Sequence, residues 1–80
     1  MHSSRYTHVL LDDDSGEPIA AVRDIDELPN GTPFGLVRPF GPNEPETYVW
    51  LDGLHVLRLA DASPHVRNHV AWELSQPQSA

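Results

Sequence analysis

The sequence contains neither cysteine nor lysine, and each absence excludes several kinds of chemistry. Without cysteine the chain has no disulfide framework, no thiolate nucleophile and no cysteine-based zinc site. Without lysine it has no Schiff-base chemistry, no phosphate-loop lysine and no Ser-Lys pair. Because the thiol count gives no reason to expect an oxidising compartment, we expect a cytoplasmic protein.

Long apolar runs are also missing, since runs such as Val9-Leu10-Leu11 are only a few residues long. A membrane-spanning helix needs about 20 apolar residues in succession. The first six residues are polar and do not form the apolar segment of a signal peptide. We therefore expect a soluble protein that makes no contact with a membrane.

Positive charge is scarce, because five basic residues stand against twelve acidic ones and the formal net charge is -7. All five basic residues are arginines, and they are scattered singly along the chain. Direct binding to DNA or RNA depends on a basic stripe that displaces counterions from the phosphates. We therefore expect no direct nucleic-acid binding.

The chain length of 80 residues fits one domain, residues 1–80, with a single modest core. Residues 5–11 and 19–25 have the composition of strands. The polar turn between them, from Asp12 to Gly16, predicts an antiparallel hairpin. We expect residues 1–4 and 76–80 to fray.

The middle of the chain predicts further strands. A tight turn at Asn30-Gly31 precedes a strand over residues 34–38, which neighbouring prolines make short or place at an edge. Residues 47–51 and 54–59 flank Asp52-Gly53, a strong signal for a second hairpin. Because both of these segments have apolar residues on both faces, we place this hairpin at the centre of the sheet.

A C-terminal helix is predicted over residues 64–74, because Ser63 followed by Pro64 is a favourable N-cap and first turn. Val66, Val70 and Leu74 form the stripe expected to face the core. The fold class is therefore α+β: a small antiparallel sheet of two β-hairpins, four to five strands in all, with one C-terminal helix packed across it. A small, partly open β-barrel with the same helix is the alternative.

Two aromatic groups are candidates for either the core or a contact surface. Tyr48 and Trp50 alternate with smaller residues in a strand, and aromatic residues in such a position are most often part of the core. Trp72 projects away from the apolar stripe of the helix, on the same broad side as His65, His69 and Asn68. We predict that these four helix residues form a partner-binding patch, with closure of the sheet edge by Trp72 as the alternative.

The same helix carries a possible metal site. His65, His69 and Glu73 follow one another at intervals of four residues and so line up along one side. A solvated helix face with an ordinary His-Glu contact is the simpler interpretation, because no fourth ligand is evident.

The acidic residues gather at turns. Asp12, Asp13, Asp14 and Glu17 form the densest group, but their spacing does not match a calcium-binding loop, so we interpret them as a solvated acidic surface. Together with residues 24–27 and 44–46 they also allow imitation of nucleic-acid phosphates, although a continuous acidic stripe is lacking.

These observations predict a small, acidic, non-enzymatic protein-binding module, a regulatory or inhibitory accessory protein whose partner is another protein. No cofactor is expected. The alternatives are a nucleic-acid mimic that inhibits a DNA-binding protein and a metal-binding protein that uses the helical His-x3-His-x3-Glu stripe. A free strand edge in so small a sheet also leaves a homodimer open.

Overall fold

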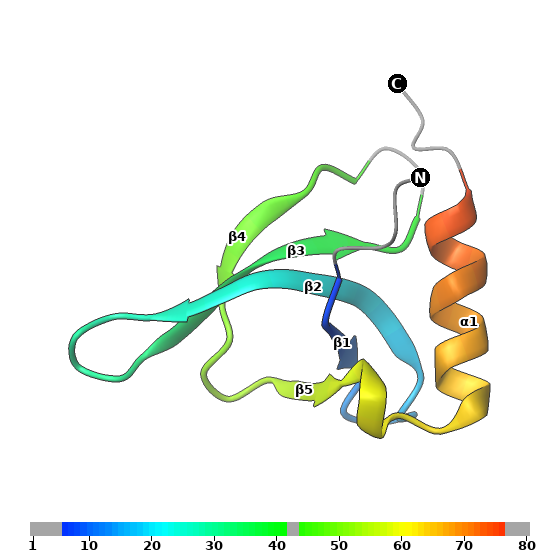
Figure 1. Cartoon of the computed structure of the whole chain (residues 1–80), viewed down its shortest axis with the longest axis horizontal. Coiled ribbons are helices and arrows are strands. Elements are labelled where there is room, and N and C mark those ends of the chain that lie inside the picture. Colours follow the sequence, from blue (N-terminus) through cyan, green and yellow to red (C-terminus); the bar gives the residue numbers. More distant parts are fainter. Residues whose placement is uncertain (1–5, 42–43, 77–80) are drawn as a thin grey trace.

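A computed structural model describes residues 6–41 and 44–76 of the chain. Five strands come first, followed by one turn of 3-10 helix and an α-helix (Figure 1). Their bounds are β1 His8–Leu11, β2 Pro18–Glu27, β3 Pro33–Pro39, β4 Thr47–Trp50, β5 His55–Arg58, η1 Leu59–Asp61 and α1 Pro64–Ser75. The predicted fraying of residues 1–4 and 76–80 falls outside the described residues except at Gln76, which is the C-cap of α1.

The strands form one open antiparallel sheet in the order β4-β3-β2-β1-β5. This arrangement, with a single C-terminal helix, confirms the predicted α+β class. The first hairpin, β1 with β2, is confirmed as well. The turn at Asn30-Gly31 joins β2 to β3, with Gly31 at a φ of 89° and its N–H donating to the carbonyl of Leu28 at 2.8 Å.

The predicted pairing around Asp52-Gly53 is wrong. Gly53 does adopt a positive φ of 80°, and Leu54 N–H donates to the carbonyl of Leu51 at 3.1 Å, so a turn is present. However, β4 pairs with β3 and β5 pairs with β1, so these two strands lie at opposite edges of the sheet instead of its centre. Because the connection from Trp50 to His55 can span at most about 18 Å, the sheet must curl to bring its two edges near each other.

Strand β3 also differs from expectation, because it is seven residues long and lies inside the sheet. Its two prolines, Pro33 and Pro39, occupy its first and last positions. A proline at a strand end removes no hydrogen-bond donor from the middle of the ladder, and this explains why an interior strand tolerates both.

The core is divided between the two faces of the curled sheet. On one face α1 packs Val66 and Val70 against Val9 and Leu11 of β1, together with Ala62. The predicted helix stripe is thus confirmed, because Leu74 is partly buried against the same cluster as the two valines. Ser63 Oγ accepts the predicted capping bond from Val66 N–H at 3.3 Å. The other face carries a second buried cluster of Ala20, Val22, Val37 and Leu51.

Helix α1 covers only part of its face. In Figure 1 it lies beside the end of the sheet where β1 and β2 meet, whereas β4 and the tip of the β2–β3 hairpin extend away from it. No helix in residues 6–41 and 44–76 is long and apolar enough to cross a membrane. The uncovered part of the sheet is where the candidate site lies.

Candidate functional site

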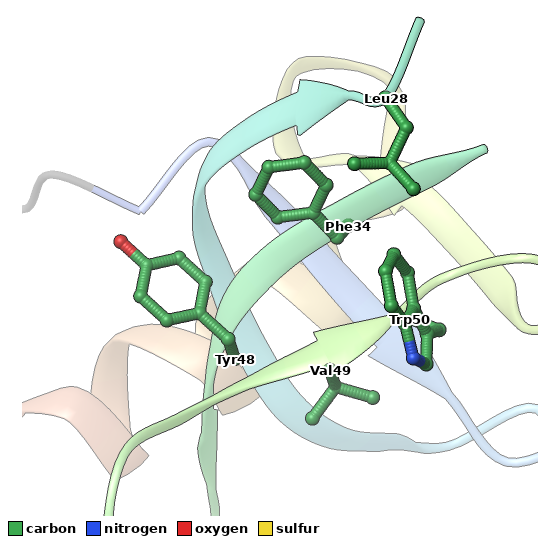
Figure 2. A pocket seen from close by; sticks show the side chains of 5 residues that line it. All are labelled: Leu28, Phe34, Tyr48, Val49 and Trp50. Carbon is green, nitrogen blue, oxygen red and sulfur yellow. The ribbon is translucent and has the colours of Figure 1, made fainter. Parts of the chain in front are cut away.

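Three aromatic rings and one leucine share the uncovered side of β3 and β4 (Figure 2). We call this set the aromatic face and define it as Leu28, Phe34, Tyr48 and Trp50. Phe34 lies directly opposite Trp50 in the ladder, and its ring centroid is 6.1 Å from that of Trp50 and 6.1 Å from that of Tyr48. Both pairs meet edge to face, at interplanar angles of 78° and 61°, an arrangement that aromatic quadrupoles favour.

The aromatic face is open to solvent. Tyr48 is 61% exposed, Trp50 59% and Leu28 37%, so the prediction that Tyr48 and Trp50 belong to the core is wrong. The reason is that β4 is an edge strand and α1 covers the opposite end of the sheet. With Val49, the four residues line a shallow, mostly apolar pocket of about 240 Å³.

A β-bulge in β2 shapes this region. Arg23 pairs with Leu36 and Asp26 with Phe34, so β2 contains one residue more than β3 over this interval. The extra residue is accommodated at Asp24, whose φ of 55° is left-handed. Such a bulge increases the local twist and turns the end of the hairpin away from the covered part of the sheet.

Gly35 lies between the aromatic face and the core. A Cβ atom at this position would lie 3.0 Å from Val22 Cγ1, 3.1 Å from Ile25 Cγ1 and 3.3 Å from Leu51 Cδ1. The absence of a side chain therefore lets β3 approach the buried cluster closely.

An ion pair anchors the start of β4. Arg23 Nε donates to Glu46 Oε2 at 2.8 Å and a terminal guanidinium nitrogen donates to Oε1 at 3.3 Å, while the Tyr6 hydroxyl donates to Oε2 at 2.8 Å. The Arg23 and Glu46 side chains are only 22% and 23% exposed. The hydrogen bond from Arg23, and then that from Tyr6, keep the pKa of Glu46 below its ordinary value although burial opposes this. The pKa of Tyr6 is raised, first by burial and then by its bond to Glu46.

The four residues of the predicted helix patch lie on α1 and not on the strands that carry the aromatic face. Trp72 is 59% exposed, and Asn68 and His65 are exposed as well. His69 is half-buried, because its ring stacks on Phe40 at a centroid distance of 6.0 Å. Three of the four predicted patch residues are thus exposed on α1, whereas the rings of the aromatic face belong to β3 and β4.

The three candidate metal ligands are not brought together. His65 Nε2 lies 3.3 Å from Glu17 Oε1, and His69 Nε2 lies 3.3 Å from Glu73 Oε2. Each histidine therefore has its own carboxylate. Within the part of the chain that the structure describes, no three His, Asp or Glu side chains form a group that could hold a metal ion.

The predicted acidic surface lies at the β1–β2 turn, beside the start of α1. Asp12 has a structural role there, since its Oδ2 accepts from the backbone N–H groups of Ser15 at 2.9 Å and of Asp14 at 3.2 Å. The bond from Ser15 N–H is the main reason that the pKa of Asp12 is lowered. Asp13, Asp14 and Glu17 are exposed.

Comparison with known proteins adds no further assignment, because no protein-family model, curated protein or solved structure matches the chain. The assignment of the site therefore depends on the geometry of this chain alone.

Proposed function

We propose that the protein is a small, non-enzymatic protein-binding module, an accessory protein of regulatory or inhibitory type, and that it contacts its partner through the aromatic face. The observation that carries this proposal is the exposure of Tyr48 and Trp50 on an edge strand, 61% and 59%, around a preformed apolar pocket. Tryptophan and tyrosine are enriched among the residues that dominate binding energy at protein interfaces. They combine a large apolar area with few rotatable bonds.

The composition of the pocket supports binding over catalysis. Its lining consists of Leu28, Phe34, Val49, Trp50 and Tyr48, so its side chains offer apolar surface and two polar groups, the Tyr48 hydroxyl and the Trp50 indole N–H. The groups whose pKa values are shifted, among them Asp12 and Glu46, are engaged in internal hydrogen bonds at a turn and at the start of β4.

The exposed area of the Tyr48 and Trp50 rings limits how much they can contribute to the free energy of binding. Their exposed parts together amount to about 270 Å², or about 6–7 kcal/mol of gross apolar burial. Association costs about 4–15 kcal/mol in lost translational and rotational freedom alone. The rings can therefore anchor a partner, but stable binding requires further contacts around them.

Capture from the source-cell lysate tests the proposal. Immobilised protein should retain a specific partner, Trp50→Thr should lose it, and Trp72→Gln should keep it. The two variants are well matched because both tryptophans are 59% exposed. Loss of the partner with Trp72→Gln alone would contradict the proposal and point to the helix patch. Retention by both variants with release at raised salt would contradict it too, and would favour the acidic surface at Asp12–Glu17.

A further inference from the structure

We propose that the aromatic face is occupied by an extended, basic peptide segment of a partner protein, which adds to β4 as an antiparallel strand. This inference rests on the proposed function and names the chemistry of the partner. It follows from three features of β4: its unpaired backbone groups, the position of its aromatic side chains and the charge around it.

The outer edge of β4 presents unpaired backbone groups. Leu51 N–H donates to the carbonyl of Pro33 at 3.0 Å, so these two residues lie opposite each other at a hydrogen-bonded position. In an antiparallel ladder such positions alternate, which makes Gly35 and Val49 the next bonded pair. The N–H and C=O groups of Tyr48 and Trp50 consequently point away from β3, and in the described residues no strand pairs with β4 on that side.

The same two residues supply the exposed rings. A strand that pairs antiparallel with β4 places the side chains opposite Tyr48 and Trp50 on the same face as their rings. Main-chain hydrogen bonds and side-chain burial on the aromatic face would therefore come from the same residues of the incoming segment. This combination supplies the further contacts that the rings alone lack, and it is the general mode of peptide binding by strand addition.

The charge around the site favours a basic segment. Exposed carboxylates flank β4 at Glu44 and Asp52, and Asp26 and Glu27 lie at the end of β2 beside Phe34. No arginine occurs between Arg38 and Arg58 in the sequence. Arg23, the nearest cation on this part of β2, is held by Glu46. Arg38 also lies near Glu46, at the start of β4. Among the described residues, a segment with arginine or lysine on either side of its apolar residues would nevertheless meet mainly carboxylates at the rim.

The same charges oppose pairing with a second copy of this chain. Two β4 strands paired antiparallel would bring Glu44 and Glu46 of one copy toward Asp52 of the other. Each copy also carries a net charge of -7. Like charges directly opposite each other on neighbouring strands are destabilising.

A random heptapeptide display library, selected on the immobilised protein, tests the inference. We expect the enriched peptides to carry net positive charge and apolar β-branched or aromatic residues at alternate positions. A resynthesised peptide should bind Trp50→Thr at least about tenfold more weakly and Trp72→Gln with unchanged affinity. Titration can be followed by fluorescence in Trp72→Gln, where Trp50 is the one remaining tryptophan. If Trp50→Thr does not fold, as judged by circular dichroism, Tyr48→Thr takes its place.

An N-methyl scan of the same peptide isolates the main-chain contribution. Methyl groups on alternate nitrogens should weaken binding at least about tenfold in one set of positions, and leave it unchanged in the other set. Raised salt should also weaken binding.

The outcomes separate the two proposals. Strand addition by a basic segment would be overturned if the enriched peptides were acidic or neutral, or if N-methylation were tolerated equally at every position. It would also be overturned if the protein formed a dimer that Trp50→Thr dissociates. In these cases a lysate partner that depends on Trp50 would still support the aromatic face as the binding surface. If neither the peptides nor the lysate partner depends on Trp50, both proposals fail.

Discussion

Replacing Trp50 by threonine should cost the fold little, because the ring lies on the surface. The indole is 59% exposed, so only about two fifths of its area is covered in the isolated protein. For a side chain of about 250 Å², that fraction is about 100 Å², or at most about 2.5 kcal/mol of apolar burial. Since unfolded chains already bury part of this area, we expect Trp50→Thr to lower the free energy of unfolding by about 1–2 kcal/mol. Threonine retains a high strand preference, so the change isolates the ring.

Chemical denaturation with parallel thermal unfolding measures this effect. A loss of about 1.5 kcal/mol corresponds to a decrease in Tm of about 6–12 °C for a domain of this size. Val22→Ala serves as the core comparison, because Val22 is 0% exposed and should lose about 2–3 kcal/mol for two carbon atoms and the cavity left behind. Trp50→Thr removes the larger group and should nevertheless cost no more. A loss of 3–5 kcal/mol, the range typical of a core tryptophan, would refute the assignment of Trp50 to an open surface.

Three further predictions concern the scaffold of the aromatic face. Gly35→Ala should lower the free energy of unfolding by about 1–3 kcal/mol in denaturant titrations, because the new Cβ would lie 3.0 Å from Val22 Cγ1. An unchanged midpoint would show that β3 packs loosely against Val22 at this position. Since the pKa of Glu46 is lowered in the folded state, its contribution to stability is present above its unfolded pKa of about 4.5 and is lost as the pH falls through the lower folded value. Tm measured against pH should therefore fall less steeply below that pH in Glu46→Gln than in the wild type, and parallel profiles would contradict the role of the ion pair. Asp24→Val should lower the free energy of unfolding by about 1–2 kcal/mol, because a β-branched residue is unfavourable at a φ of 55°. Asp24→Gly should be at least as stable as the wild type. Equal losses of stability in both variants would argue against the left-handed bulge.

Local signals in the sequence predict the elements well. The turn from Asp12 to Gly16, the turn at Asn30-Gly31 and the Ser63-Pro64 helix start all involve contacts between residues close in the sequence, and all three are present. Their residue types act through local backbone preferences and capping bonds, which do not depend on the rest of the fold.

Strand pairing was harder to predict, because it depends on distant residues. Asp52-Gly53 does form a turn, yet His8 pairs with Arg58 and the chain crosses from one sheet edge to the other. A two-residue turn signal predicts that the chain reverses locally. It does not predict which strands the segments on either side of the turn will pair with. The long-range pairing with β1 closes a loop of about 50 residues, and nothing in the local pattern specifies it.

The candidate site could also be predicted only in part, because it too depends on contacts between residues far apart in the sequence. The alternation of residues 47–51 correctly places Tyr48 and Trp50 on one face, but alternation cannot tell a covered face from an open one. The shortness of β4 is the signal that points to an edge. Pro45 and Asp52-Gly53 leave six residues between them, of which four, Thr47–Trp50, form the strand, and short strands flanked by proline favour a sheet edge. Phe34 was not recognised because its role depends on pairing with Trp50 across β3 and β4.

Site-specific photo-crosslinking in the source cell tests the binding surface most directly. A photo-reactive amino acid is incorporated at position 48, on β4, or at position 72, on α1, which have similar exposed fractions of 61% and 59%. We predict a discrete adduct with a partner protein from position 48 and none from position 72. Adducts from position 72 alone, or from neither position, would contradict the assignment of the aromatic face as the surface through which this protein acts.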